Sequence, residues 1–130
     1  MGGSRGEWRR PAVEVVGELI TAVSDGRIED LLALTDPEVV CRPATRPGLT
    51  VYEGHDGMAR LVGDLSLAYG RHRIEVDDIT ADTASQVTAR TRVIQETDRG
   101  DVLVASITSV YTLREGMVTF IDGEPGTSLG

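Results

Sequence analysis

The chain has 130 residues, of which 40% are hydrophobic and 26% are charged, and its formal net charge is −8. This length and composition are typical of a single globular domain. The negative charge disfavours nucleic acid and anionic membranes as partners, because both attract clustered positive charge. All 13 basic residues are arginines, which excludes a lysine Schiff-base mechanism.

Cysteine and histidine are scarce, with one Cys and two His residues. Cys41 lies in an apolar run, where we expect a small buried side chain and no internal disulfide. His55 and His72 are isolated from further metal ligands, so we expect no metal ion and no cofactor. The chain has no apolar run of the ~18 residues that a membrane helix needs, and no apolar stretch follows the basic N-terminus. We therefore expect no membrane association and a cytoplasmic protein.

The first part of the chain predicts a tail and two helices. Residues 1–10 are predicted to be a flexible tail, followed by one domain over residues 11–124 and a C-terminal tail over 125–130. Pro11 suits the first turn of a helix, and the apolar residues of AVEVVGELITAVSDG recur at helical spacing until Asp25-Gly26. The stretch RIEDLLALTDPEVV predicts a shorter helix that ends at Pro37, with a strand beginning near Val39.

A loop and a third helix follow. The segment CRPATRPGLT contains two prolines and a glycine, which is typical of a connecting loop, here one that could rim a cavity. VYEG reads as a brief extended piece. Asp56 is expected to cap the third helix, whose apolar residues form one stripe: Met58, Leu61, Val62, Leu65 and Tyr69.

The remainder predicts four strands, over residues 73–84, 85–96, 102–114 and 117–122. Tight turns are expected at TDRGD and at EG, and a bulge or turn at Asp77-Asp78. Such an antiparallel meander must cover one apolar face with the helices, which gives an α+β domain.

The strand 102–114 has two different faces. Its odd positions are the more apolar: Leu103, Ala105, Ile107, Tyr111 and Leu113. Its even positions are uncharged: Val102, Val104, Ser106, Thr108, Val110 and Thr112. A solvated face normally carries charge, so we expect the even face to pack against a second copy of the chain in a homodimer.

Four stretches together resemble the nuclear transport factor 2-like superfamily and, within it, the small SnoaL-like proteins. These stretches are AVSDGRIEDLLALTDPEVV, YEGHDGMARLVGDL, IEVDDITADTASQVTARTRV and SVYTLREGMVTFID. The resemblance covers roughly residues 11–122. It implies a cone-shaped, curved antiparallel sheet wrapped by three N-terminal helices, with a cavity at the wide end and frequent homodimers. This superfamily includes enzymes, binding modules and structural domains, so the fold alone does not define a function.

The resemblance allows individual chemistries to be compared with this sequence. Ketosteroid-isomerase-like members place a carboxylate base just before a proline on the first strand, where VCRP has Arg42, which cannot abstract a proton. SnoaL-type polyketide cyclases carry a His-Trp-Asp-like stretch on the last strand, and VTFID has only Asp122. Members resembling limonene-epoxide hydrolase need two Asp and an Arg, whereas Arg90 and Arg92 have only Glu96 nearby.

Dehydratase-like members use two His with Tyr and Asp, which Tyr52, His55, His72 and Asp56 match by residue type but not by spacing. The glycines that flank His55 favour a structural or capping role for its imidazole over ligand contact or acid–base catalysis. His72, between two arginines, is expected at the exposed start of a strand.

Arg42 is the polar side chain that we place most readily in the cavity, paired with an acid such as Glu53 or Asp122 or with a ligand. The tyrosines are expected in the core, where a hydroxyl could line a cavity. The full set of cavity candidates is Arg42, Tyr52, His55, Tyr69, Tyr111 and Asp122. The predicted function is binding of a small hydrophobic molecule. The alternative is a cofactor-free enzyme, such as a cyclase, isomerase or dehydratase, acting on such a molecule.

Overall fold

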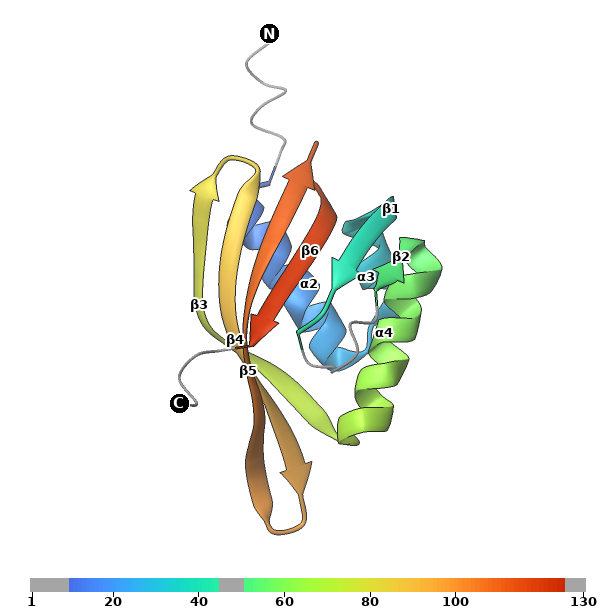
Figure 1. Ribbon diagram of the computed structural model, residues 1–130, viewed down its shortest axis with the longest axis vertical. Helices are drawn as coiled ribbons and strands as arrows, with labels where there is room; N and C mark the ends of the chain where they lie inside the picture. Colours follow the sequence, from blue (N-terminus) through green and yellow to red (C-terminus); the bar gives the residue numbers. More distant parts are fainter. Residues whose placement is uncertain (1–9, 45–50, 126–130) are drawn as a thin grey trace, which may run out of the picture.

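The computed structural model describes residues 10–44 and 51–125. Three helices, α2 (Ala12–Asp25), α3 (Ile28–Ala33) and α4 (Gly54–Tyr69), accompany six strands (Figure 1). The strands are β1 (Thr35–Arg42), β2 (Tyr52–Glu53), β3 (His72–Thr83), β4 (Gln86–Thr97), β5 (Gly100–Arg114) and β6 (Met117–Pro125). The predicted α+β class, with N-terminal helices and a curved sheet, is confirmed. None of the helices in this part of the chain is long and apolar enough to cross a membrane.

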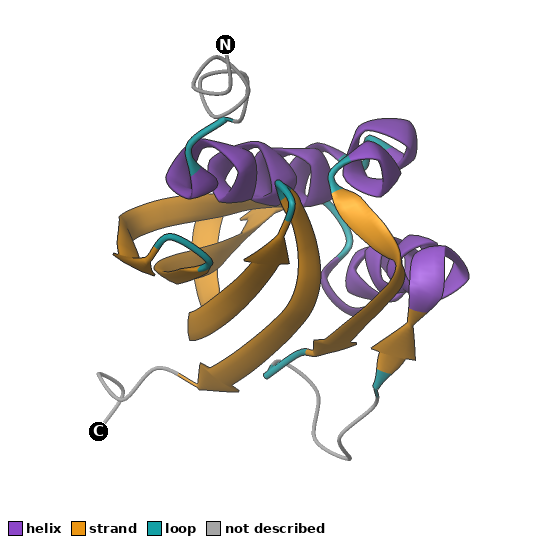
Figure 2. Cartoon of the chain, turned by 90° about the horizontal axis from the view of Figure 1, so that it is seen from above, coloured by secondary structure: helices purple, strands orange, loops and turns teal. Residues whose placement is uncertain are grey.

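One sheet contains all six strands, in the order β2-β1-β6-β5-β4-β3. The meander β3 to β6 is antiparallel as predicted, but β1 and β6 run parallel. The sequence made no prediction for the pairing of β1 with β6, which adds one parallel pair to the antiparallel sheet. Parallel neighbours need a long crossover connection, and here α4 and the strands β3 to β5 supply it. Figure 2 shows the strands curving beneath α2, with α4 beside β1 and β2.

The helix α2 forms where the apolar periodicity predicts it. Val16, Leu19 and Ile20 are buried on one face, against the sheet. The helix ends as Gly26 adopts a φ of 71°, and the Gly26 N–H binds the carbonyl of Val23 at 3.2 Å. Gly readily adopts this left-handed conformation, so Asp25-Gly26 is an effective stop signal.

The second helix is shorter than predicted, and the first strand starts earlier. The helix α3 ends at Ala33, and β1 already begins at Thr35, whose buried hydroxyl donates to the carbonyl of Leu31 at 3.2 Å. Pro37 therefore lies inside the strand instead of ending the helix. The pairing with β6 shifts register between Thr35 and Val40, and a proline is tolerated at such an irregularity because no ladder hydrogen bond is required of it.

The third helix also begins before the predicted cap. Its N-cap is Glu53, not Asp56, and neither end relies on a side-chain cap. Gly57 fits here because a Cβ at this position would lie 2.9 Å from the backbone carbonyl carbon of Tyr52. The glycines around His55 thus let the first turn of α4 pack directly on β2.

The turns and the bulge agree with the sequence. Thr97 pairs with Gly100 across the first hairpin, and Glu115 and Gly116 at the second have φ values of 55° and 82°. Two residues with positive φ match the twist of a tight hairpin. The β3–β4 register shifts between Val76 and Asp78, at the expected bulge. These features bend the sheet around the helices and leave space between the sheet and the helices.

Candidate ligand cavity

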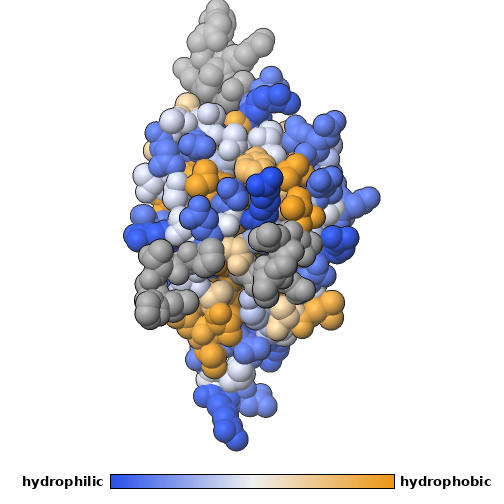
Figure 3. Space-filling model, in the orientation of Figure 1, coloured by the Kyte–Doolittle hydropathy of each residue, from blue (hydrophilic) through white to orange (hydrophobic). Residues whose placement is uncertain are grey.

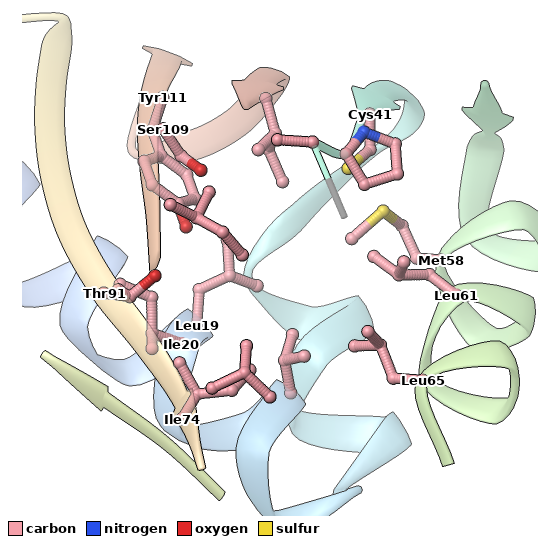
Figure 4. A pocket seen from close by; sticks show the side chains of 16 residues that line it. Leu19, Ile20, Cys41, Met58, Leu61, Leu65, Ile74, Thr91, Ser109 and Tyr111 are labelled. Carbon is pink, nitrogen blue, oxygen red and sulfur yellow. The ribbon is translucent and has the colours of Figure 1, made fainter. Parts of the chain in front are cut away.

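A cavity of about 90 Å³ lies between the curved sheet and the helices α2 and α4, and 16 of the described residues line it (Figure 4). The helices contribute apolar side chains: Leu19, Ile20 and Val23 from α2, and Met58, Leu61 and Leu65 from α4. Every strand of the meander contributes as well, together with Cys41 of β1 and the two residues after β1, Pro43 and Ala44. Successive strand residues point to opposite faces, so alternate residues of each strand reach this space.

Four of these 16 described side chains carry polar groups, namely those of Cys41, Thr91, Ser109 and Tyr111. All four residues are buried, with exposed fractions between 3% and 8%. Thr91, Ser109 and Tyr111 lie on one wall in Figure 4, opposite Met58, Leu61 and Leu65 of α4. The cavity therefore has an apolar helical side and a sheet side that carries hydroxyl groups.

The two titratable groups among these lining residues are neutral at physiological pH. Burial raises the pKa of the Cys41 thiol to about 12, and Asp122 adds a smaller contribution in the same direction. Burial also raises the pKa of Tyr111, with a smaller contribution from Cys41, although a hydrogen bond with Ser109 opposes the rise. Removal from water disfavours the thiolate and the phenolate, so both groups remain protonated. Their chemistry in the cavity is hydrogen bonding.

A comparison with protein families identifies the family to which this domain belongs. Residues 16–121 match the model of the SnoaL-like domain. The chain belongs to the SnoaL-like domain family. The resemblance seen in the sequence is thereby confirmed for most of the chain, and no curated protein matches this SnoaL-like domain.

Solved structures share the fold of this SnoaL-like domain. TerC, co-crystallised with polyporic acid, has a TM-score of 0.74 at 18% identity, covering 92% of this chain and 95% of TerC. A Catenulispora acidiphila protein with a ketosteroid isomerase-like fold, in complex with trimethylamine, has a TM-score of 0.73 at 9% identity, covering 88% and 87%. A putative polyketide cyclase from Sinorhizobium meliloti has a TM-score of 0.68 at 17% identity, covering 85% and 94%. At these identities the similarity shows the fold alone.

Arg42 and Asp122 lie on the opposite side of the sheet from the cavity. The two residues are register partners on the parallel strands β1 and β6, and neither lines the cavity. Their neighbours Cys41 and Ile121 face the cavity, so strand alternation directs Arg42 and Asp122 outward. Arg42 is exposed, with its guanidinium carbon 5.8 Å from the ring centre of Phe120. This placement differs from the cavity position expected from the sequence.

The expected ion pairs of Arg42 are also not formed. Within residues 10–44 and 51–125, no carboxylate, including those of Glu53 and Asp122, lies within 4.0 Å of its guanidinium. An exposed guanidinium is solvated by water, so it needs no such partner to offset its burial.

Tyr52 and His55 hold β2 and α4 in place. Tyr52 is 1% exposed, and its hydroxyl donates to the carboxylate of Asp64 at 2.5 Å. The Nε2 of His55 donates to the carbonyl of Thr35 at 3.0 Å, which ties the start of α4 to the start of β1. Neither residue lines the cavity. These contacts correspond to the structural role that the flanking glycines of His55 favoured.

Tyr69 and His72 meet at the other end of α4. Their ring centres are 6.1 Å apart in an edge-on arrangement, and His72 Nδ1 donates to the carbonyl of Gly70 at 2.7 Å. Tyr69 does not line the cavity, so Tyr111 is the one sequence-predicted candidate among the described residues that does. In the described part of the SnoaL-like domain, no three His, Cys, Asp or Glu side chains are grouped to hold a metal ion.

Arg90 and Arg92, the arginines compared with epoxide hydrolases, face away from the cavity. Arg92 Nε donates to Asp77 at 2.8 Å, and Arg90 forms an ion pair with Asp78 at 3.5 Å. Thr91, between them, points to the opposite side and lines the cavity. These arginines therefore stabilise the β3–β4 pair on the outer face of the sheet.

Sequence reasoning did not single out Thr91 and Ser109. A signal for Ser109 exists, because 109 belongs to the apolar odd positions of strand 102–114, and a hydroxyl among inward residues indicates a polar point in a core. The signal for Thr91 is its position between Ala89 and Val93, which share its face and are buried. This pattern is easily missed in the sequence, because the charged residues Arg90 and Arg92 flank Thr91.

Proposed function

We propose that this SnoaL-like domain binds a small, mainly apolar molecule in the cavity between the sheet, α2 and α4. The observation that carries the proposal is a cavity of about 90 Å³ whose described lining is apolar apart from four neutral polar side chains. Pockets for drug-sized ligands measure about 300–1,000 Å³, whereas an engineered apolar cavity of about 150 Å³ binds benzene. The size therefore favours a ligand no larger than a single ring.

Binding is favoured over acid–base catalysis by the protonation of the lining groups. A general acid or base works best with a pKa near the operating pH. The raised pKa values of Cys41 and Tyr111 keep both groups protonated, and the described lining residues include no Asp, Glu, His or Arg. A cofactor-free cyclase, isomerase or dehydratase would need such a group at the ligand.

A pair of substitutions on α4 tests the proposal. Leu65 lines the cavity and is 8% exposed, whereas Leu67, on the same helix, is 87% exposed. Leu65→Phe enlarges a side chain inside the cavity, and Leu67→Phe makes the same change in solvent. We expect cyclohexanone or methylenecyclohexane to produce saturable NMR shifts of cavity residues in the wild type and in Leu67→Phe. Leu65→Phe should weaken this binding at least tenfold. No saturable shift in the wild type would overturn the proposal.

We further propose that the outer face of the sheet joins two copies of the domain. Val40, Phe120 and Thr112 are consecutive partners across β1, β6 and β5, and all three are half-buried. Figure 3 views the side on which β6 lies in front of α2, where hydrophobic patches alternate with hydrophilic side chains. Protein interfaces likewise combine apolar and polar side chains, so this mixed surface supports the proposal.

The dimer is tested by Phe120→Glu. Light scattering during size exclusion should give twice the chain mass for the wild type and the monomer mass for this variant. Leu67→Glu, on an exposed part of α4, is the control and should stay dimeric. A wild-type monomer at micromolar concentration would contradict the proposal. We also propose a cytoplasmic location, which a single buried cysteine with no internal disulfide supports.

A further inference from the structure

We propose that the cavity selects neutral ligands that carry a carbonyl or a similar uncharged acceptor, which the hydroxyls of Thr91 and Tyr111 bind and orient. This inference rests on the ligand-binding function proposed above and names the chemical class of the ligand. It is carried by the position and hydrogen-bonding state of Thr91, Ser109 and Tyr111.

The three hydroxyl groups form one line across two neighbouring strands. On β4, Thr91 is the register partner of Ile107, and Ala89 is the partner of Ser109 on β5. Ser109 is therefore a diagonal neighbour of Thr91 on the same face, and Tyr111 follows it two residues along β5. Figure 4 shows the side chains of all three on the cavity wall that faces α4. A ligand in the cavity would meet this line on one side and hydrocarbon on the other.

Thr91 is the decisive residue, because its hydroxyl is buried and has no hydrogen-bond partner among the described residues. The residue is 7% exposed, and its side chain forms no hydrogen bond with any residue in the described ranges. Buried hydroxyls almost always have a partner, since leaving one unpaired costs its desolvation free energy. A hydroxyl directed into a cavity can recover that free energy by binding a ligand atom. By contrast, Thr35, the other buried threonine among the described residues, is satisfied by the carbonyl of Leu31.

Tyr111 supplies the second donor. Its hydrogen bond with Ser109 lowers the pKa of Tyr111, against the larger effect of burial. Each of these two hydroxyls can donate or accept, so one of them donates within the pair and the other keeps a free O–H. When Ser109 donates to the phenol oxygen, Tyr111 offers its O–H to an acceptor in the cavity. Thr91 and Tyr111 thus both offer O–H donors, which complement a carbonyl oxygen with its two lone pairs.

The described lining also distinguishes neutral ligands from charged ones. The described lining residues include no Arg, Asp, Glu or His, and the Cys41 thiol remains protonated. A carboxylate or ammonium ligand would lose its hydration without gaining an opposite charge, which is strongly unfavourable. The cavity therefore favours a neutral carbonyl compound over a charged molecule of the same size.

The test compares two isosteric probes, cyclohexanone and methylenecyclohexane, which differ in an oxygen against a CH₂ group. Dissociation constants are measured by NMR titration for the wild type, Thr91→Val and Tyr111→Phe. Thr108→Val, on the outer face of β5, is the matched control. We expect each cavity substitution to weaken cyclohexanone about two- to tenfold, as for the loss of one hydrogen bond, and to leave methylenecyclohexane unchanged or tighter. Thr108→Val should change neither, and cyclohexanecarboxylate should bind at least tenfold more weakly than cyclohexanone.

The outcomes separate this inference from the function on which it rests. If both probes bind, and the cavity substitutions change their affinities equally or not at all, the carbonyl selectivity is overturned and the binding function stands. Tight binding of cyclohexanecarboxylate would overturn the selectivity for neutral ligands. If neither probe gives a saturable shift, the binding function itself fails. Melting curves of both variants verify that they are folded, and Tyr111→Phe provides an independent test should Thr91→Val behave anomalously.

Discussion

The inner and outer faces of the same sheet present opposite chemistries. On the inner face, the side chains of Thr91, Ser109 and Tyr111 are buried among hydrocarbon and are neutral. On the outer face, arginines and acids form exposed pairs, such as Arg92 with Asp77. The stretch Arg90-Thr91-Arg92 contains both environments within three residues, because consecutive strand residues alternate between faces. Adjacent residues in this sequence are therefore poor guides to each other's environment.

The largest expected effect comes from placing a charge on the inner face. Thr91→Asp puts a carboxylate in a cavity whose described lining offers no opposite charge, and we expect it to lower the free energy of unfolding by about 3–5 kcal/mol. Thr80→Asp places the same carboxylate on the outer face of the neighbouring strand β3, where Thr80 is exposed and water can solvate the charge. Urea denaturation should show a change below about 1 kcal/mol for this control. Equal losses in the two variants would refute the distinction between the faces.

The pH dependence of stability reports on the inner face through Cys41. Its pKa rises from the ordinary thiol value of 9.0 to about 12 in the folded chain. Between these values the unfolded chain has lost the thiol proton and the folded chain retains it. Stability is therefore fully present below pH 9 and decreases as the pH rises towards 12, by up to about 1.4 kcal/mol per pH unit from this group.

Cys41→Ala isolates this contribution. Urea denaturation between pH 8 and 10.5 should give a shallower decrease for the variant than for the wild type, and the remaining slope includes Tyr111. Labelling with iodoacetamide at pH 8.5 should modify the wild-type thiol in urea but not in the folded protein. Identical slopes, or rapid labelling of the folded protein, would contradict the buried, protonated thiol.

A smaller effect, of opposite sign, is expected from Thr91→Val. The substitution keeps the shape of the side chain and removes a hydroxyl that has no partner in the described structure. We expect the ligand-free protein to gain about 1 kcal/mol in the free energy of unfolding, because the unpaired hydroxyl no longer has to be desolvated. The matched Thr35→Val should instead destabilise the protein, since Thr35 donates to Leu31. A loss of stability in Thr91→Val would show that its hydroxyl has a partner.

Sequence patterns predicted the helices and strands better than they predicted which side of the sheet each residue faces. Apolar periodicity located the long helix and the meander, and Asp77-Asp78 indicated the bulge. The parallel pairing of β1 with β6 depends on a contact between distant segments, for which local patterns contain no information. The same pairing explains the outward position of Arg42, which a motif alignment had placed in the cavity. Val39 and Cys41 are buried, so alternation along β1 already favoured an outward Arg42.

The smallest expected effect is that of Arg42→Ala. A buried Arg42 paired with an acid would leave an unpaired carboxylate when removed, at a loss of about 3–5 kcal/mol. In the structure Arg42 is exposed and its described surroundings offer the ring of Phe120 at 5.8 Å. Exposed cation–π contacts contribute about 0.5–1 kcal/mol, so the variant should unfold within about 1 kcal/mol of the wild type. Its affinity for cyclohexanone should also be unchanged, because Arg42 faces away from the cavity. If urea denaturation showed that the free energy of unfolding falls by more than about 3 kcal/mol, Arg42 would have to be buried and paired.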